Sequence, residues 1–102
     1  MYRILITTSN DKNILKTIAK DCIVNKNISP CAHLADRINS LYVWDDDFIC
    51  KEEYILAIKC EARHVDEISN IINEHHNYDV PEIISFNFNI VSDQYKEWFI
   101  KK

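Results

Sequence analysis

The sequence predicts one α+β domain in which two helices cover a single face of a four-stranded sheet. Three observations lead to this fold class. The chain has 102 residues, 47% hydrophobic and 27% charged, which suits a single well-packed domain over residues 1–102. Apolar residues alternate in four segments, and they recur every three to four positions in the segments between. The segments follow the order strand, helix, strand, strand, helix, strand, and a short helix ends the chain.

A change of hydrophobic period separates the first strand from the first helix. Residues 3–8 form a β-branched run, and Ser9-Asn10-Asp11 after it offers side chains that cap a helix. The helical pattern begins at Asp11 and stops at Asn25-Lys26-Asn27. Its apolar face comprises Ile14, Leu15, Ile18, Ala19, Cys22 and Ile23.

A long hairpin follows Pro30. Its first side is predicted in two pieces, residues 31–34 and 37–44, and its second side is residues 48–60. Asp45-Asp46-Asp47 forms the turn between them. In the second piece alternate residues share a face, with Ile38, Ser40, Tyr42 and Trp44 on one side and Leu41 and Val43 on the other.

The last third of the chain adds a helix, a strand and a terminal helix. The helix is predicted from about Ala62 to Glu74, and Pro81 directs the chain into a fourth strand at residues 83–88. Ser92-Asp93 caps the terminal helix. This order is the split βαβ arrangement of ferredoxin-like domains, in which right-handed crossovers place both main helices on one face. On the helix predicted from Ala62 to Glu74, the stripe expected to be buried is Val65, Ile68, Ile71 and Ile72.

The hairpin is too long for a lone domain. Thirteen residues at 48–60 extend about 43 Å, whereas a domain of this size has a diameter of about 35 Å. The hairpin should therefore project from the body and carry Tyr42, Trp44 and Phe48 with it. Exposed aromatic strands with open edges are avoided by stable monomers. We therefore expect an obligate oligomer closed by cyclic symmetry, as a dimer or trimer.

Composition excludes several classes of function. The chain has no glycine, so it cannot contain a dinucleotide-binding turn, a Walker A loop or a G-x-S-x-G nucleophile elbow. Its net charge is −4 without a basic cluster, which argues against nucleic acid as a partner. No apolar run spans a membrane and no signal peptide precedes the first strand, so we expect a cytoplasmic protein whose four cysteines are reduced.

Four segments resemble the CutA divalent-cation tolerance proteins, and they occur in the family's order across essentially the whole chain. The segments are Ser40-Leu41-Tyr42-Val43-Trp44, Lys59-Cys60, residues 76–83 (HNYDVPEI) and Tyr95-Lys96-Glu97-Trp98. The resemblance implies a homotrimer of ferredoxin-like subunits whose strands pair across subunits, with an architecture like that of the PII signalling proteins. One departure lies in the hairpin turn, where Asp46 replaces the usual glycine.

The resemblance implies a protein that binds divalent metal ions, with copper the ion most often named for the family and His75 and His76 as the candidate ligands. Imidazole nitrogens suit copper. Thr7 stands where copper-binding members have a cysteine, so the soft ligand is missing. The alternative for His76 is a hydrogen-bonded helix end. Cys31 and His33 offer two ligands at best.

A second interpretation is a PII-like signalling or scaffold protein that binds a small effector between subunits. Catalysis is not expected, because no Ser/His/Asp or Cys/His set can be assembled by spacing. The aromatic residues of the cleft could equally pack the subunit interface. The residues that the resemblance places in this inter-subunit cleft are Tyr42, Trp44, Lys59, Tyr78, Glu82 and Trp98.

Overall fold

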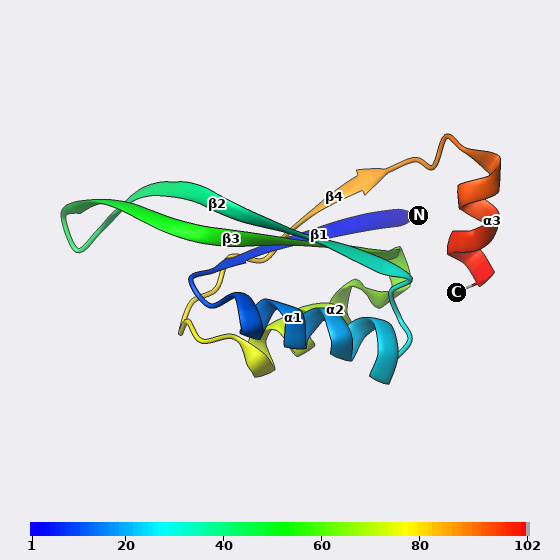
Figure 1. Cartoon of the computed structure of the whole chain (residues 1–102), viewed down its shortest axis with the longest axis horizontal. Coiled ribbons are helices and arrows are strands. Elements are labelled where there is room, and N and C mark those ends of the chain that lie inside the picture. Colours follow the sequence, from blue (N-terminus) through cyan, green and yellow to red (C-terminus); the bar gives the residue numbers. More distant parts are fainter. Residues whose placement is uncertain (102) are drawn as a thin grey trace.

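The computed structural model, which describes residues 1–101, contains the predicted order of strands and helices (Figure 1). The strands are β1 (Tyr2–Ser9), β2 (Cys31–Trp44), β3 (Asp47–Glu61) and β4 (Ile84–Phe88). The helices are α1 (Lys12–Lys20) with a following π-helical turn η1 (Asp21–Asn25), α2 (Val65–His75) with a preceding 3-10 turn η2 (Ala62–His64), and α3 (Asp93–Lys101).

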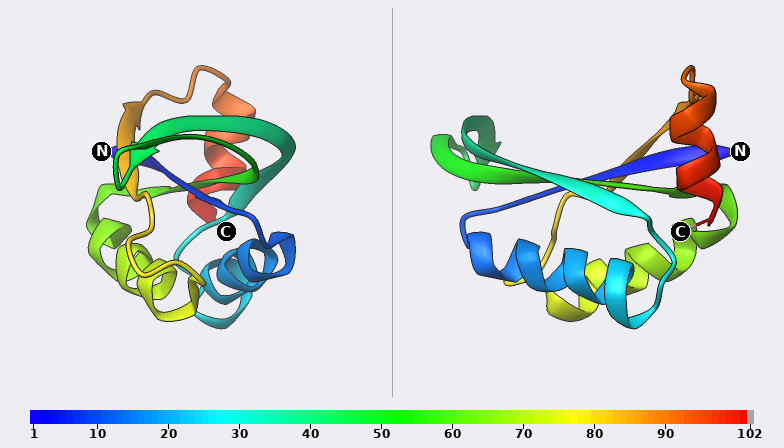
Figure 2. Two further views of the ribbon diagram at one scale, coloured as in Figure 1. Left: turned by 90° about the vertical axis from the view of Figure 1, so that its left-hand side faces the viewer. Right: turned by 45° about the vertical axis from the view of Figure 1, so that its right-hand side comes forward.

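The four strands form one antiparallel sheet in the order β2-β3-β1-β4. Helices α1 and α2 lie side by side against one face of this sheet, as both views of Figure 2 show. This arrangement confirms the predicted α+β class and the placement of both main helices on one face. Each helical segment begins close behind its strand: α1 starts at Lys12 after β1 ends at Ser9, and η2 starts at Ala62 directly after β3.

The core lies between the sheet and these two helices. Alternate residues of β1 and β3 point toward the helices, and apolar stripes of α1 and α2 meet them. Burying one such aliphatic side chain contributes about 1.5–3 kcal/mol. The buried cluster consists of Leu5, Leu15, Ile18, Cys22, Leu56, Ile58, Cys60, Ile68, Ile71 and Ile72.

Two of the four cysteines are part of this core. Cys22 and Cys60 are fully buried, and desolvation raises the pKa of Cys22 to about 12 and that of Cys60 to about 11. Both therefore stay neutral thiols that pack as small apolar side chains. All four cysteines are free in the described part of the chain.

Polar side chains fix the start of α1. The carboxylate of Asp11 accepts the backbone N–H groups of Asn13 at 3.0 Å and Ile14 at 3.3 Å. The hydroxyl of Ser9 accepts the N–H of Asp11 at 3.0 Å. The predicted cap at Ser9-Asn10-Asp11 is thus confirmed, and Asp11 is the N-cap residue.

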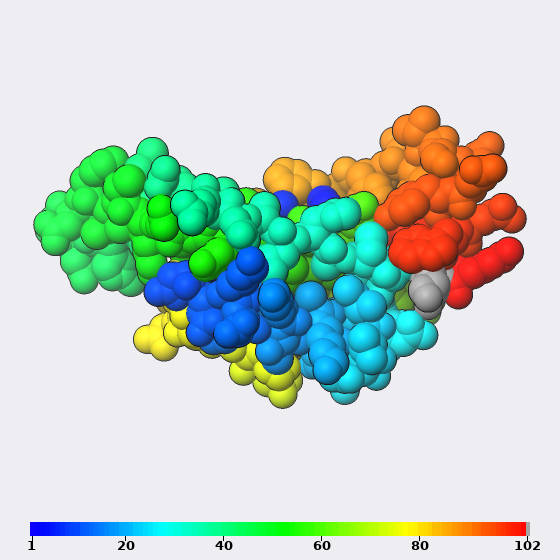
Figure 3. All heavy atoms as spheres, viewed as in Figure 1, coloured from blue at the N-terminus to red at the C-terminus, as the bar shows by residue number. Residues whose placement is uncertain are grey.

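The hairpin of β2 and β3 projects beyond the helices, as Figure 3 shows in the teal and green atoms. We call residues 38–53 the arm. The chain measures 47 × 26 × 21 Å, so the arm makes it much longer than a compact domain. At its tip Asp45 (φ 50°) and Asp46 (φ 67°) form a two-residue turn, because Trp44 pairs with Asp47.

The first side of the hairpin differs from the prediction. Residues 31–34 and 37–44 belong to one continuous strand, β2, and the interruption between them is a bulge in its pairing with β3 between Ala35 and Ile38. Arg37 adopts a left-handed backbone there, with φ 57°. The bulge bends the strand without ending it, which explains why sequence periodicity breaks while the strand continues.

The second face of the sheet is only partly covered. Helix α3 packs over one end, where Tyr2, Phe88 and Phe99 form an aromatic cluster with ring centroids 5.4–6.1 Å apart. Beyond α3 this face stays apolar, and Ile84 and Phe86 are 45% and 53% exposed. We call the uncovered region the open face; it consists of Ile4, Ile6, Ile55, Ala57, Ile84 and Phe86.

No helix within residues 1–101 has the length and apolar character needed to cross a membrane.

Replacing Thr7 with valine is expected to stabilise the fold. The Thr7 hydroxyl is fully buried and, within residues 1–101, has no hydrogen-bond partner. The Thr7→Val variant keeps the side-chain shape and removes this unpaired group, so its free energy of unfolding should rise by about 1 kcal/mol in urea titrations. The control is Thr17→Val. The Thr17 hydroxyl is exposed and donates to the Asn13 carbonyl, so its removal should change the free energy of unfolding by less than about 0.5 kcal/mol. Destabilisation by Thr7→Val would contradict the burial of an unpaired hydroxyl.

Candidate functional site

His76 ends helix α2, and both of its ring nitrogens have partners. Its Nδ1 accepts the backbone N–H of Tyr78 at 3.0 Å. The proton must then sit on Nε2, which donates to the carbonyl oxygen of Thr8 at 2.8 Å. The imidazole therefore joins the loop after α2 to the end of β1. A metal ion could bind His76 only if one of these hydrogen bonds were broken.

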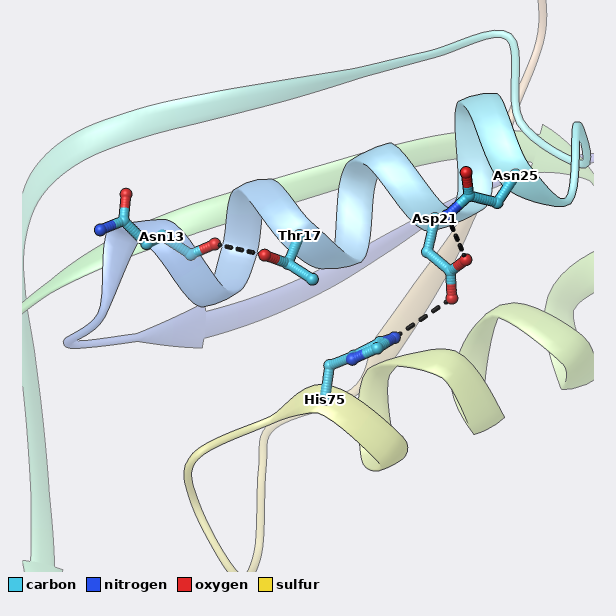
Figure 4. Close-up of polar contacts among 5 residues, drawn as sticks. All are labelled: Asn13, Thr17, Asp21, Asn25 and His75. Carbon is cyan, nitrogen blue, oxygen red and sulfur yellow. Dashed lines mark hydrogen bonds and ion pairs between the residues drawn. The ribbon is translucent and has the colours of Figure 1, made fainter.

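His75 occupies the preceding position but faces the π-helical turn η1. Its Nε2 is 3.1 Å from Oδ2 of Asp21, and Asn25 donates to the other carboxylate oxygen at 2.9 Å (Figure 4). The hydrogen bond from Asn25, followed by the contact with His75, lowers the pKa of Asp21. This half-buried pair joins the C-terminal end of α2 to the π-helical turn.

The two candidate metal ligands thus point to different partners, and the structure does not bring their nitrogens to one point. No group of three or more histidine, cysteine, aspartate or glutamate side chains that could hold a metal is present among the described residues. Cys31 and His33 lie on one face of β2, and the Cys31 sulfur contacts the hydroxyl of Tyr95 at 3.2 Å.

A buried carboxylate stands at the base of the arm. Glu53 is only 6% exposed and accepts the hydroxyl of Tyr78 at 2.5 Å, while that hydroxyl accepts the backbone N–H of Asn10 at 2.9 Å. The ammonium of Lys51 lies 4.2 Å from the centre of the Tyr78 ring, a cation–π distance. Burial, and next the bond to Glu53, raises the pKa of Tyr78, and contact with the Tyr78 hydroxyl raises the pKa of Lys51. These groups form a connected polar cluster, which we call the Tyr78 cluster.

The residues predicted for the inter-subunit cleft lie in three places. Lys59 donates to Tyr95 of α3 at 3.1 Å, and Tyr95 stacks on Trp98 of the same helix with ring centres 5.6 Å apart, so Lys59 and Trp98 lie where α3 meets β3. Tyr42 and Trp44 are exposed on the arm. Trp44 pairs with Asp47, which is twelve positions from Lys59, or about 40 Å along β3. Within one chain these two groups cannot share a site.

The other two predicted cleft residues are near the end of β1 and the start of β4. Tyr78 belongs to the cluster described above, whereas Glu82 is exposed in the segment before β4. Sequence reasoning missed Glu53 and Lys51. One signal for Glu53 was available in the sequence: it is an acidic residue on the same face of β3 as the apolar residues Ile55 and Ala57.

Acidification is expected to destabilise the fold through His76. Burial lowers the pKa of His76 below its ordinary value of 6.5. The unfolded chain therefore binds a proton before the folded chain does, and stability must fall as pH drops below about 6.5. Urea unfolding between about pH 8 and about pH 5, at one protein concentration, should show this loss. In the His76→Gln variant the loss over this range should shrink.

The matched control is His33→Gln, which removes an exposed imidazole from β2. That variant should keep the full pH dependence of the parent chain. A His76→Gln variant with unchanged pH dependence would show that His76 is not held neutral by the fold. The Asp21 carboxylate acts separately, because its lowered pKa affects stability only as pH falls below its ordinary value of 3.8.

Solved structures share this architecture. The CutA1 protein of Ehrlichia chaffeensis matches with a TM-score of 0.87 at 28% identity, covering 98% of this chain and 92% of that one. The CutA1 protein of Oryza sativa matches with a TM-score of 0.89 at 25% identity, covering 98% of this chain and 91% of that one. Both matches include the long hairpin and α3, since nearly the whole chain is aligned.

Sequence comparison gives the same relationship. The chloroplastic CutA protein of Arabidopsis thaliana is 32% identical over 76 residues, which are 74% of this chain and 42% of that protein. The chain thus spans about half the length of the curated relatives it matches. The family model described as the CutA1 divalent ion tolerance protein matches residues 3–102. The chain therefore belongs to the CutA1 divalent ion tolerance family.

Proposed function

We propose that the chain acts in cellular tolerance of divalent cations, as a homotrimer that binds a divalent metal ion such as Cu²⁺. The observation that carries this proposal is the match of the divalent ion tolerance family over residues 3–102. The fold of solved CutA1 proteins over nearly the whole chain supports it.

The trimer is supported by apolar surface that one chain leaves exposed. The open face continues into the arm, where Trp44 is 59% and Phe48 is 71% exposed. Both outer strands of the sheet also present unpaired edges, since the order is β2-β3-β1-β4. Neighbouring subunits that pair with β2 and cover the open face would bury the exposed apolar surface and satisfy the unpaired strand edge. Threefold rather than twofold closure rests on the resemblance to the family.

Sedimentation velocity tests the trimer. The parent chain should sediment as a species of about three times 12.1 kDa. Phe86→Asp places a charge in the open face. Burying this unpaired charge in an interface would cost desolvation free energy, so the population should shift toward the monomer. Val24→Asp is the matched control, since Val24 is 62% exposed on η1 in the helical layer. A folded monomer for the parent chain, or equal effects of both substitutions, would contradict the proposed interface.

For the metal, His75 is the better ligand of the predicted pair. Only one of its ring nitrogens has a partner within the described residues, and that partner is the carboxylate of Asp21 at 3.1 Å. A histidine and a carboxylate could both coordinate a divalent ion after small rotations, whereas His76 is fixed by two backbone groups. We infer a weak site at His75 and Asp21, with His76 as a ligand only if its bond to Thr8 opens.

Calorimetric titration of Cu²⁺ into the full chain tests this site. His75→Ala and Asp21→Asn each remove one proposed ligand, and each should lower the affinity at least about tenfold. His33→Ala, on the exposed side of β2, serves as the control and should bind as the parent does. Unchanged affinity and stoichiometry in His75→Ala and in the His75→Ala/His76→Ala double variant would rule out a histidine site.

A second candidate function is binding of a small effector between subunits, as in PII-like signalling or scaffold proteins. The Tyr78 cluster favours it, because Glu53 is a buried carboxylate on the same side of the sheet as the open face. Only a neighbouring subunit could bring an arm, with Tyr42 and Trp44, near Lys59 and Trp98. Binding of metabolites but not of Cu²⁺ would favour this function over the first.

A cytoplasmic location and the lack of enzymatic activity stay predictions. Four free cysteines support a reducing compartment. The similar protein of A. thaliana is named chloroplastic, so the family is not confined to one compartment.

A further inference from the structure

The arm loses regular strand pairing at the level of the sheet where the Tyr78 cluster lies. Strand β1 pairs with β3 as far as Ser9 opposite Tyr54, so Glu53 is the first residue of β3 that pairs only with β2. The bulge of β2 lies at the same level. A two-stranded ribbon on its own is only marginally stable in water. The angle between the arm and the body, which is the part of the chain outside the arm, therefore depends on contacts beyond strand pairing.

Side-chain packing gives this junction little support on the side of the bulge. A cavity of about 220 Å³ lies there, between the bulge, β3 and the turn after β1. Most of its lining side chains are exposed. The lining residues are Asn10, Arg37, Glu52, Glu53 and Tyr54.

Tyr78 contacts two residues on one face of the arm. Its hydroxyl donates to the carboxylate of Glu53, which is only 6% exposed. The ammonium of Lys51, two residues closer to the tip, lies 4.2 Å from the centre of the Tyr78 ring. The same hydroxyl accepts the N–H of Asn10 in the turn after β1, at 2.9 Å. The phenol thus continues the connection between β1 and β3 beyond their last backbone pair.

The loop that carries Tyr78 is itself fixed to the end of β1. The backbone N–H of Tyr78 donates to Nδ1 of His76 at 3.0 Å, and Nε2 of His76 donates to the carbonyl of Thr8 at 2.8 Å. The hydroxyl of Ser9 donates to the side-chain oxygen of Asn77 at 2.6 Å. Figure 1 shows this loop, in yellow, beside the turn from β1 into α1. Tyr78 is therefore a fixed point of the body that the arm contacts.

We propose that Tyr78 is a positioning residue, which sets the angle of the arm relative to the body through its contacts with Glu53 and Lys51. Removing its hydroxyl would take a donor away from a buried carboxylate, and such a loss is costly. An arm with a fixed direction can pair with a neighbouring subunit without first being ordered. Only this consequence for association rests on the proposed homotrimer, because the contacts themselves lie within one chain.

Hydrogen exchange of the full chain tests this role. In Tyr78→Phe, the backbone amides of residues 38–53 should exchange at least about fivefold faster than in the parent, because a hydrogen bond to a buried charged group is lost. The amides of α1 and α2 should change by less than about twofold. The same local increase is expected when Tyr78→Phe is added to Phe86→Asp, a background in which association is already weakened.

Three variants separate positioning from general stabilisation. Tyr54→Phe removes a hydroxyl from the residue next to Glu53, outside the Tyr78 cluster, and should leave arm exchange within about twofold of the parent. In a Glu53→Met background, Tyr78→Phe should add less than about twofold, because the carboxylate that accepts the hydroxyl is already gone. Glu53→Gln keeps an acceptor oxygen and should preserve most of the protection that Glu53→Met loses.

The proposal is overturned if the arm and the helices accelerate equally, because Tyr78 would then only stabilise the fold. Unchanged arm exchange in Tyr78→Phe, or an equal effect of Tyr54→Phe, would also overturn it. If Tyr78→Phe does not fold, Lys51→Met is the deciding variant, since it removes the cation–π contact and leaves the loop intact. It should accelerate arm exchange about two- to fivefold, and an unchanged arm would refute the role of Tyr78.

Sedimentation velocity provides the readout for association. Tyr78→Phe should shift the trimer toward the monomer, and Tyr54→Phe should not. A trimer that persists in Tyr78→Phe despite faster arm exchange would refute the consequence for association. A parent chain that sediments as a monomer would contradict the homotrimer itself, and arm exchange would still decide whether Tyr78 positions the arm.

Discussion

The structure depends on the continuity of a single strand, β3. Over Tyr54–Glu61 it pairs with β1 inside the body and sends Leu56, Ile58 and Cys60 into the core. Residues 47–53 of β3 pair only with β2, and they form one side of the hairpin that projects as the arm. Because one strand serves both parts, its alternation fixes which side chains face the helices and which face the open side. If the pairing register of β3 shifted by one residue, its core side chains would turn to the open face and its open-face side chains would turn to the core. Core packing therefore also determines the orientation of the arm.

Much of this fold could be predicted from the sequence, because each change of hydrophobic period coincides with a change of element. The break inside β2 could not be predicted. Arg37 takes a left-handed backbone at a bulge, where glycine or asparagine is the usual signal, and arginine gives none. The end of the first helix was near its predicted place, but its last turn is π-helical.

The candidate site was less predictable, because its partners are far apart in the sequence. His76 binds the carbonyl of Thr8, which lies 68 residues earlier, and Tyr78 joins Asn10 to Glu53. Spacing along the chain cannot reveal such contacts. It did suggest a hydrogen-bonded helix end as the alternative for His76, and the geometry agrees with that alternative. The resemblance to the family made the adjacent histidines candidate ligands, whereas helical geometry turns their side chains toward different neighbours, Asp21 for His75 and Thr8 for His76.

A chain without glycine has fewer conformations to lose on folding, since every residue carries a Cβ that restricts the unfolded ensemble. The opposing effect is local strain at the four residues with left-handed backbones. Three of them, Arg37, Asp45 and Asp46, lie at the bulge or at the tip of the hairpin, outside the core. The entropy advantage is spread along the chain, while the strain is concentrated in its least buried segment. In the proposed trimer, neighbouring subunits would cover this segment, so ordering of the hairpin would be coupled to association and would depend on protein concentration.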